Sequence, residues 1–255
     1  MTLTLSATAA ALVLLSVFVG VALQRVSGTG AGLVLAPMLT LIIGPDSGVL
    51  ITNVTTAMST VLLTIAMRRD IDWPRALPIM AFALPGAFLG ALVVGQVSEA
   101  WLQVLVGALV LGAIGTTVLV AALGRLPHYD RPWLAPVGGF LGGTLNTIAG
   151  VGAPPMVILA KLTRWDHRSF AATAQPVFMT MGTASVLAKL SMDSVSAALP
   201  PLWIFPASIG AVVVAIWVGG LVARRVSGTV AGEIAMALAA LGGLSALVRG
   251  LIQVF

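Results

Sequence analysis

The chain has 255 residues, of which 59% are apolar and only 8% charged, and its mean hydropathy is +1.09. A soluble domain carries about a quarter charged residues, so the composition indicates an all-α protein that crosses a lipid bilayer several times. The net charge of +5 comes from scattered cations, which argues against a nucleic-acid partner. The absence of cysteine excludes disulfides and thiolate metal sites.

Apolar segments follow one another along the whole chain. Because a helical residue rises about 1.5 Å, about 20 residues span the hydrocarbon core. Most segments reach that length, but the second and the seventh are too short to cross as straight helices. The segments are 3–23, 31–43, 48–67, 74–94, 100–123, 133–148, 151–160, 169–190, 200–222 and 228–250.

The cations mark one side of the membrane. Ten of the thirteen Lys and Arg residues fall in loops that share one side if the full spans alternate: 68–75, 125–131, 161–168 and 224–225. Cytoplasmic loops carry an excess of Lys and Arg. We therefore expect a multi-pass protein of the cell inner (plasma) membrane, with these four loops in the cytoplasm and the N-terminus outside.

The segments 133–148 and 151–160 lie between two loops that are both expected in the cytoplasm. They form either a re-entrant hairpin that reaches the midplane or two undersized helices that cross and return. We favour the hairpin, in which protein or a polar cavity surrounds the non-helical backbone at its tip.

A weak internal repeat appears when the sequence is shifted by 122 positions. Residues 18–31 and 140–153 then share six identities in fourteen places. Gln24 aligns with Asn146, and Asn53 aligns with Gln175 at the same offset. Polar amides thus recur at equivalent places in the two halves.

The repeat predicts the domain organisation. The first repeat comprises residues 1–124, with a helix pair broken at 24–30 and then three spans. A cytoplasmic linker, 125–132, leads to the second repeat, 133–255, with a pair broken at 146–152 and three more spans. Because the halves point in opposite directions, we expect an inverted-topology repeat with a substrate site at the midplane, as in many secondary transporters.

The two breaks have the chemistry of an anion site. Each restarts a helix, whose free N–H groups and roughly half a positive charge attract anions. The guanidinium of Arg25 offers a planar fork of donors, and the amides add neutral donors. We expect the following substrate-binding residues: Gln24, Arg25, Ser27, Gly28, Gly30, Asn53, Asn146, Thr147, Gly150, Gly152 and Gln175.

Several of these polar residues have a structural alternative. Arg25 could anchor the cytoplasmic end of a full first helix, and the amides could be hydrogen-bonded links between helices. Glu233 is the candidate for proton coupling, but it could pair with Arg224 or Arg225. For Lys189 we favour snorkelling to the membrane surface over an anion gate. The loop His and Asp residues show neither metal-ligand nor triad spacing, so we expect no enzyme activity, metal or cofactor.

The glycine-rich stretches GTGAGLVLAP, at 28–37, and GVGAPP, at 150–155, resemble the duplicated motif GxGGGxxxxP of the sulfite exporter TauE/SafE (TSUP) family. The resemblance covers essentially the whole chain and implies a membrane transporter of sulfite, thiosulfate or an organosulfonate. Ala31 and Ala153 replace the central glycine and Pro154 the last one, so the identity of the anion is not carried over. We expect alternating access around a midplane anion site; the alternative is a membrane-embedded scaffold or assembly factor without transport.

Overall fold

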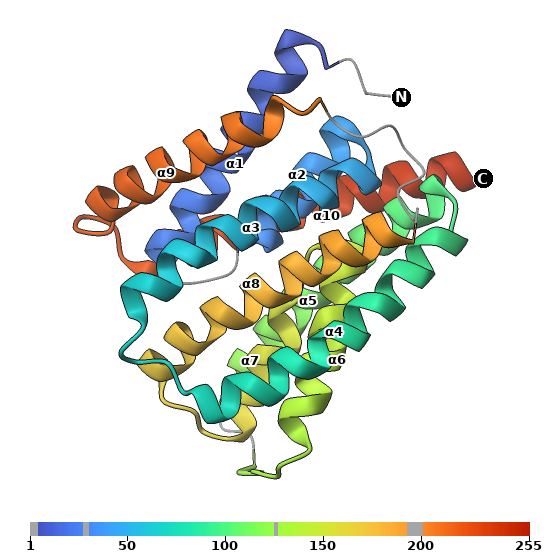
Figure 1. Ribbon diagram of the computed structural model, residues 1–255. Helices are drawn as coiled ribbons and strands as arrows, with labels where there is room; N and C mark the ends of the chain where they lie inside the picture. Colours follow the sequence, from blue (N-terminus) through green and yellow to red (C-terminus); the bar gives the residue numbers. More distant parts are fainter. Residues whose placement is uncertain (1–4, 28–30, 125–126, 193–200) are drawn as a thin grey trace.

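The structure is a computed structural model that describes residues 5–27, 31–124, 127–192 and 201–255. These ranges fold into α-helices without any strand, and each predicted apolar segment is a helix (Figure 1). This confirms the all-α architecture. The helices are α1 (Ala7–Ser27), α2 (Gly32–Ile43), α3 (Pro45–Met67), α4 (Trp73–Gln96), α5 (Glu99–Ala122), α6 (Leu134–Ala149), α7 (Ala153–Leu162), α8 (His167–Ser191), α9 (Ile204–Val222) and α10 (Gly228–Val254).

Six helices of the described chain are long and apolar enough to cross a membrane: α1, α3, α4, α5, α9 and α10. The helices α2 and α7 have only 12 and 10 residues. With 25 residues α8 is long enough to cross, but it carries polar side chains among its buried residues. The chain is therefore a polytopic membrane protein.

The connections rich in arginine gather at one end of the bundle (Figure 1). We call this the arginine-rich end and define it by residues 68–72, 127–133, 163–166 and 223–227. Both the first and the last described residues lie at the opposite end. The common placement of these loops agrees with the sequence-based topology, whereas their assignment to the cytoplasm stays a prediction.

Close helix contacts fix the position of α6 against α4. A Cβ added at Gly86 would overlap the backbone carbonyl of Phe140, and one at Gly143 would overlap that of Ala83. Small residues at such crossings let helix backbones approach closely inside membranes. These contacts hold α6 in a fixed position against α4.

The helices α6 and α7 form a hairpin. Their 16 and 10 residues correspond to lengths of about 24 and 15 Å. The amide of Tyr129 donates to the carbonyl of Leu162 at 3.0 Å, which ties the two open ends together at the arginine-rich end. The tip at Gly150 is buried inside the bundle, and the re-entrant path through the membrane stays a prediction.

The first half of the chain is built differently. Helix α1 is one of the candidate spans and continues to Ser27, whose hydroxyl donates to the Leu23 carbonyl at 2.8 Å. Residues 24–27, which belong to the expected break, are thus helical, and residues 28–30 lie outside the described residues. Only α2 is short in this half, and the inverted repeat stays a prediction.

Helix α3 is the centre of the bundle. Of its most apolar stretch, 56% is buried, a larger share than in any other candidate span. Its buried face includes Asp46, Thr52, Asn53, Ser59 and Thr60. A helix that is both central and polar needs partners for these groups, and the partners define the candidate site.

Candidate functional site

The chain's only two asparagines are bonded to each other inside the bundle. The Asn146 side-chain amide donates to Asn53 Oδ1 at 2.8 Å. The amide of Asn53 donates to the Asn146 carbonyl at 3.3 Å and to Ser185 Oγ at 2.8 Å. Asn53 is 1% exposed, Asn146 is 5% exposed, and Ser185 is fully buried. This asparagine pair joins α3, α6 and α8, and thus links the two halves.

A regular polar face runs along the contact between α3 and α8. Residues on both helices recur at intervals of seven, or about two turns, which places each set on one helix face. The two helices are antiparallel, and Asn53 contacts both Gly182 and Ser185. The same register therefore sets Asp46 opposite Lys189. We call this face the α3–α8 seam: Asp46, Asn53 and Thr60 on α3, and Gln175, Gly182 and Lys189 on α8.

Some polar atoms near the seam lack a partner. Among the described residues, the buried Oγ1 of Thr56, Oε1 of Gln175 and Nζ of Lys189 form no hydrogen bond. The Gln175 amide group uses its Nε2 to donate to the Ala171 carbonyl at 2.9 Å. Because a buried polar atom without a partner is costly, these atoms mark places where a polar ligand would gain contacts.

The tip of the α6–α7 hairpin meets the beginning of α2. Gly150 ends α6 in the left-handed conformation, with φ +70°, which a glycine adopts without strain. A Cβ at Gly32, the first residue of α2, would overlap the Gly150 carbonyl. A Cβ at Gly150 would lie 3.1 Å from the Thr52 side chain. The break in the second half therefore packs directly against the start of α2.

The two helix starts at this contact differ in their donors. The first N–H groups of a helix have no partner within the helix and can bind an anion. In α7, Pro154 and Pro155 stand in the first turn and have no N–H. Helix α2 begins with Gly32 and Leu33, which retain theirs. The beginning of α2 therefore offers more backbone N–H groups that can donate hydrogen bonds to an anion.

The neighbours Gln24 and Arg25 have different environments. Gln24 is 4% exposed and accepts a hydrogen bond from Ser59 Oγ at 3.3 Å. Arg25 is exposed, and its Cβ lies 3.0 Å from where a Cβ of Gly219 on α9 would stand. Consecutive residues of a helix point about 100° apart, so only Gln24 points into the polar interior. This placement favours the anchoring alternative for Arg25.

The remaining predicted residues are placed as follows. Thr147 is buried, with its hydroxyl bonded to the Gly143 carbonyl at 2.9 Å. Gly152 lies against Asn146, whose Cβ is 3.3 Å from a Cβ added there. Glu233 is exposed on α10 and forms no ion pair within the described chain. Gly28 and Gly30 lie outside the described residues.

Sequence reasoning missed Ser185 and Ser59, and it misjudged Lys189. The expected snorkelling of Lys189 is wrong: the side chain is 1% exposed and packs among the helices. The seven-residue spacing of Gln175, Gly182 and Lys189 could have placed Lys189 on the face of α8 that contacts α3. Neither Ser59 nor Ser185 belongs to the spaced sets. A search for apolar segments does not reveal this spacing.

Comparison with known families adds an independent finding. Residues 12–247 match the sequence profile of the family described as sulfite exporter TauE/SafE. The chain belongs to this family. No curated protein and no solved structure matches it. The TauE/SafE family consists of membrane transporters, and membership implies a small sulfur-containing anion as the substrate class.

The described part of this TauE/SafE chain contains no group of three or more His, Asp or Glu residues that could hold a metal ion. The groups around the asparagine pair are amides and hydroxyls. Such groups donate hydrogen bonds but do not supply a base or a nucleophile without further activation.

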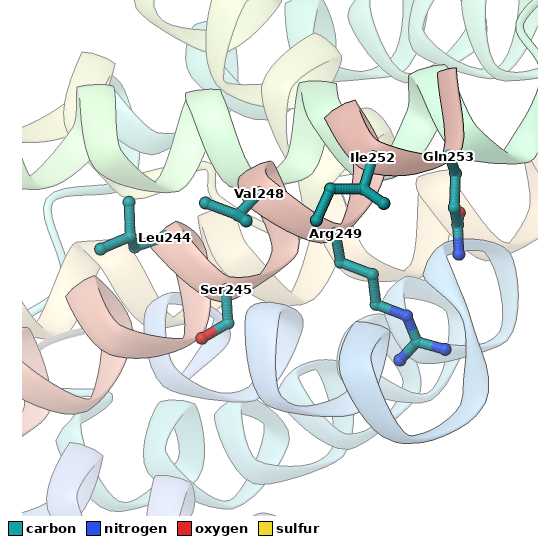
Figure 2. A pocket seen from close by; sticks show the side chains of 6 residues that line it. All are labelled: Leu244, Ser245, Val248, Arg249, Ile252 and Gln253. Carbon is teal, nitrogen blue, oxygen red and sulfur yellow. The ribbon is translucent and has the colours of Figure 1, made fainter. Parts of the chain in front are cut away.

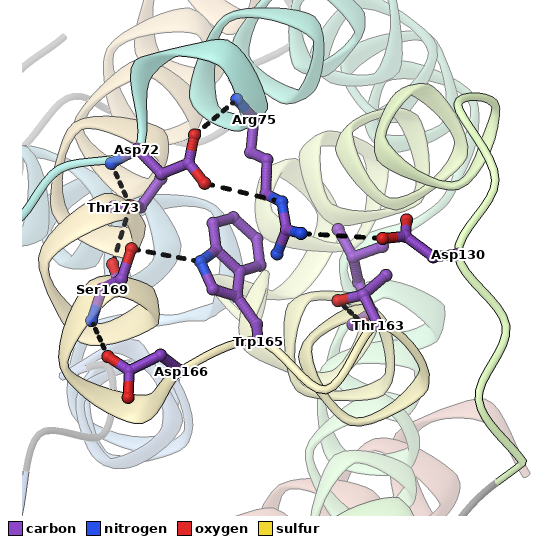
Figure 3. Close-up of polar contacts among 9 residues, drawn as sticks. Asp72, Arg75, Asp130, Thr163, Trp165, Asp166, Ser169 and Thr173 are labelled. Carbon is purple, nitrogen blue, oxygen red and sulfur yellow. Dashed lines mark hydrogen bonds and ion pairs between the residues drawn. The ribbon is translucent and has the colours of Figure 1, made fainter.

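A second polar network joins the two halves of the transporter at its arginine-rich end (Figure 3). Arg75 on α4 forms ion pairs with Asp72 at 3.5 Å and with Asp130 at 3.6 Å, and it stacks on Trp165 at 4.9 Å. The amide of Asp72 donates to Thr173 Oγ1 at 2.9 Å. We call this group of five residues the Arg75 network.

Two surface hollows of this TauE/SafE protein are lined by residues other than the asparagine pair. One is formed by six residues of α10 alone (Figure 2): Leu244, Ser245, Val248, Arg249, Ile252 and Gln253. Another, of about 390 Å³, is lined by Thr40, Glu99, Gln103 and Arg249, among others. Neither includes Asn53, Asn146 or Ser185, and these three side chains are buried.

Proposed function

We propose that the protein is a secondary transporter that exports a sulfur oxyanion, namely sulfite, thiosulfate or an organosulfonate. The observation that carries this proposal is the buried bonding of Asn53, Asn146 and Ser185 across the two halves. These hydrogen bonds lie beside the tip of the α6–α7 hairpin, which ends within the bundle. Polar groups at such a place are typical of transporter sites between two halves.

The donors at the site suit an oxyanion. Side-chain amides and hydroxyls donate to sulfonate or sulfite oxygens without adding a fixed charge. The beginning of α2 adds backbone N–H groups and the positive end of the helix dipole. When substrate enters, the two asparagine amides exchange their bonds to each other for bonds to the anion.

Alternating access requires the two halves to separate at one end at a time. In this structure the Arg75 network connects α4 with the loops around Asp130 and Trp165. We propose that it closes the cytoplasmic side of the path. Breaking it would open the route from the cytoplasm to the asparagine pair, while the opposite end stays packed.

The membrane potential favours export. Moving one charge through 100 mV is worth about 2.3 kcal/mol, which corresponds to a roughly 50-fold concentration ratio. In a plasma membrane with a negative interior, an anion therefore leaves the cell without a coupled proton. The exposed position of Glu233 agrees with a mechanism in which this residue carries none.

The test is transport by the purified protein in vesicles. Vesicles loaded with sulfite, thiosulfate or an organosulfonate should release it only when they contain the protein, and an inside-negative potential should accelerate the release. Vesicles with the double variant Asn53→Ala/Asn146→Ala serve as the control. Equal rates with and without protein for the whole set of anions would refute transport, and rates that ignore the potential would refute its electrogenic part.

A further inference from the structure

Lys189 is the buried cation of the α3–α8 seam. It is one of only two lysines in the chain. Among the fully buried residues of the described chain it has the largest volume. Its ammonium group has three donors, yet Nζ forms no hydrogen bond within the described residues. No other Lys or Arg of the described chain is buried.

The seam places a carboxylate across from this cation. Asp46 stands in the first turn of α3, is 3% exposed, and acts electrostatically on Lys189. Both residues lie seven positions from the Asn53–Gly182 contact, or about 10 Å along the helices. The pair therefore lies between the asparagine pair and the end of the bundle opposite the arginine-rich end.

Stability alone does not explain two buried charges in this position. Desolvation of an ion pair often outweighs its attraction, and apolar residues of similar size are frequently as stable. Ionisable residues within membrane segments usually serve a path for ions or substrate. Within the described residues, this ammonium group forms no hydrogen bond and has the Asp46 carboxylate as its charged neighbour. Such a cation is suited to accept a second anion.

We propose that Lys189 binds the transported oxyanion on its way to the opposite end, and that Asp46 is the internal counterion that the anion displaces. This inference rests on the proposed function, because it places a second binding residue on the same path. Without substrate, Asp46 balances the charge of Lys189. With substrate, the oxyanion takes over that role, and Asp46 keeps the cation from holding it too tightly.

The experiment measures the thermal stabilisation of the purified protein by sulfite and by thiosulfate, at fixed pH and with ionic strength balanced by gluconate. Lys189→Gln should weaken the apparent affinity for the anion at least tenfold. Asp46→Asn should strengthen it, because the competing carboxylate is gone. Lys161→Gln removes the other lysine, which is exposed on α7, and should match the unaltered protein.

The double variant Asp46→Asn/Lys189→Gln separates binding from folding. It leaves no unbalanced buried charge, so it should fold even if Lys189→Gln does not. Our proposal requires that this double variant responds at least tenfold more weakly to the anions. A response equal to that of the unaltered protein would overturn it, as would an Asp46→Asn variant that folds but loses the response.

The proposed function and this inference fail in different ways. If Asn53→Ala abolishes the anion response while Lys189→Gln leaves it unchanged, the path exists but Lys189 has no part in it. If the unaltered protein responds to none of the anions and also fails in vesicles, the proposed function falls and the inference with it.

Discussion

Gly182 on α8 lies so close to α3 that a Cβ at this position would stand only 2.8 Å from the carbonyl oxygen of Asn53. No ordinary side chain fits such an approach, so the glycine sets the spacing between the two helices. The same spacing lets the Asn53 amide reach Ser185 on the next turn of α8. The geometry of the site thus depends on Gly182, which has no side chain that could bind a ligand.

Gly182→Ala should push α3 and α8 apart, because the atom in the way is backbone and cannot turn aside. Overpacking of this kind costs about 1–3 kcal/mol, and the midpoint of thermal unfolding should fall. Gly210→Ala is the matched control, since nothing lies within 4 Å of a Cβ there. It should be neutral or slightly stabilising. Equal midpoints for both variants would mean that the contact is not tight.

The asparagine pair should show energetic coupling. Asn53→Ala and Asn146→Ala each leave a buried polar partner unsatisfied, which costs about 1–3 kcal/mol. The double variant should lose less than the sum, with a coupling of roughly 0.5–3 kcal/mol, as for residues in direct contact. Denaturation of the four proteins measures this cycle. Gln96→Ala, at an exposed position, is the control. If the losses in the free energy of unfolding are strictly additive, the hydrogen bond between Asn53 and Asn146 is contradicted.

Adjacent residues on α1 should differ in their effect on transport. Gln24→Ala removes a buried amide that contacts Ser59, and we expect at least a tenfold loss of sulfite efflux. Arg25→Ala changes an exposed side chain and should keep efflux within about twofold at equal protein density. The reverse ranking in the vesicle assay would restore Arg25 as the main binding residue and refute its role as an anchor outside the site.

Disruption of the Arg75 network should open the arginine-rich end. The chain has no cysteine, so a Thr60→Cys variant reports on access to a fully buried position of the seam. With Arg75→Ala added, a thiol reagent supplied from the arginine-rich side should label this cysteine several-fold faster. Arg69→Ala removes an exposed arginine and should leave the rate unchanged. No difference between the two would exclude the network as a gate.

The orientation in the membrane can be tested with two further single-cysteine variants. His128→Cys lies at the arginine-rich end, and Ser98→Cys lies in the turn between α4 and α5; both positions are exposed. In intact cells a membrane-impermeant maleimide should label position 98 only, because the arginine-rich loops face the cytoplasm. Labelling at 128 before the cells are opened would reverse the topology.

Hydrophobicity along the sequence determined much of the fold. Each of the ten apolar segments is a helix, and the short segment 151–160 is α7, because apolar length and glycine or proline breaks act locally on the chain. The residue pattern also singled out Asn53 and Asn146 as candidate site residues, and the structure joins them by a hydrogen bond. An amide in an apolar helix must find a partner, and the chain offers few.

Only the tertiary structure decided which polar groups meet. It turned Gln24 inward and Arg25 outward, it brought Ser185 to Asn53, and it buried Lys189 near Asp46 instead of letting it reach the membrane surface. The rotation of each helix about its axis depends on small-residue contacts such as Gly182 against Asn53. Those contacts join residues far apart in sequence, so no local pattern contains them.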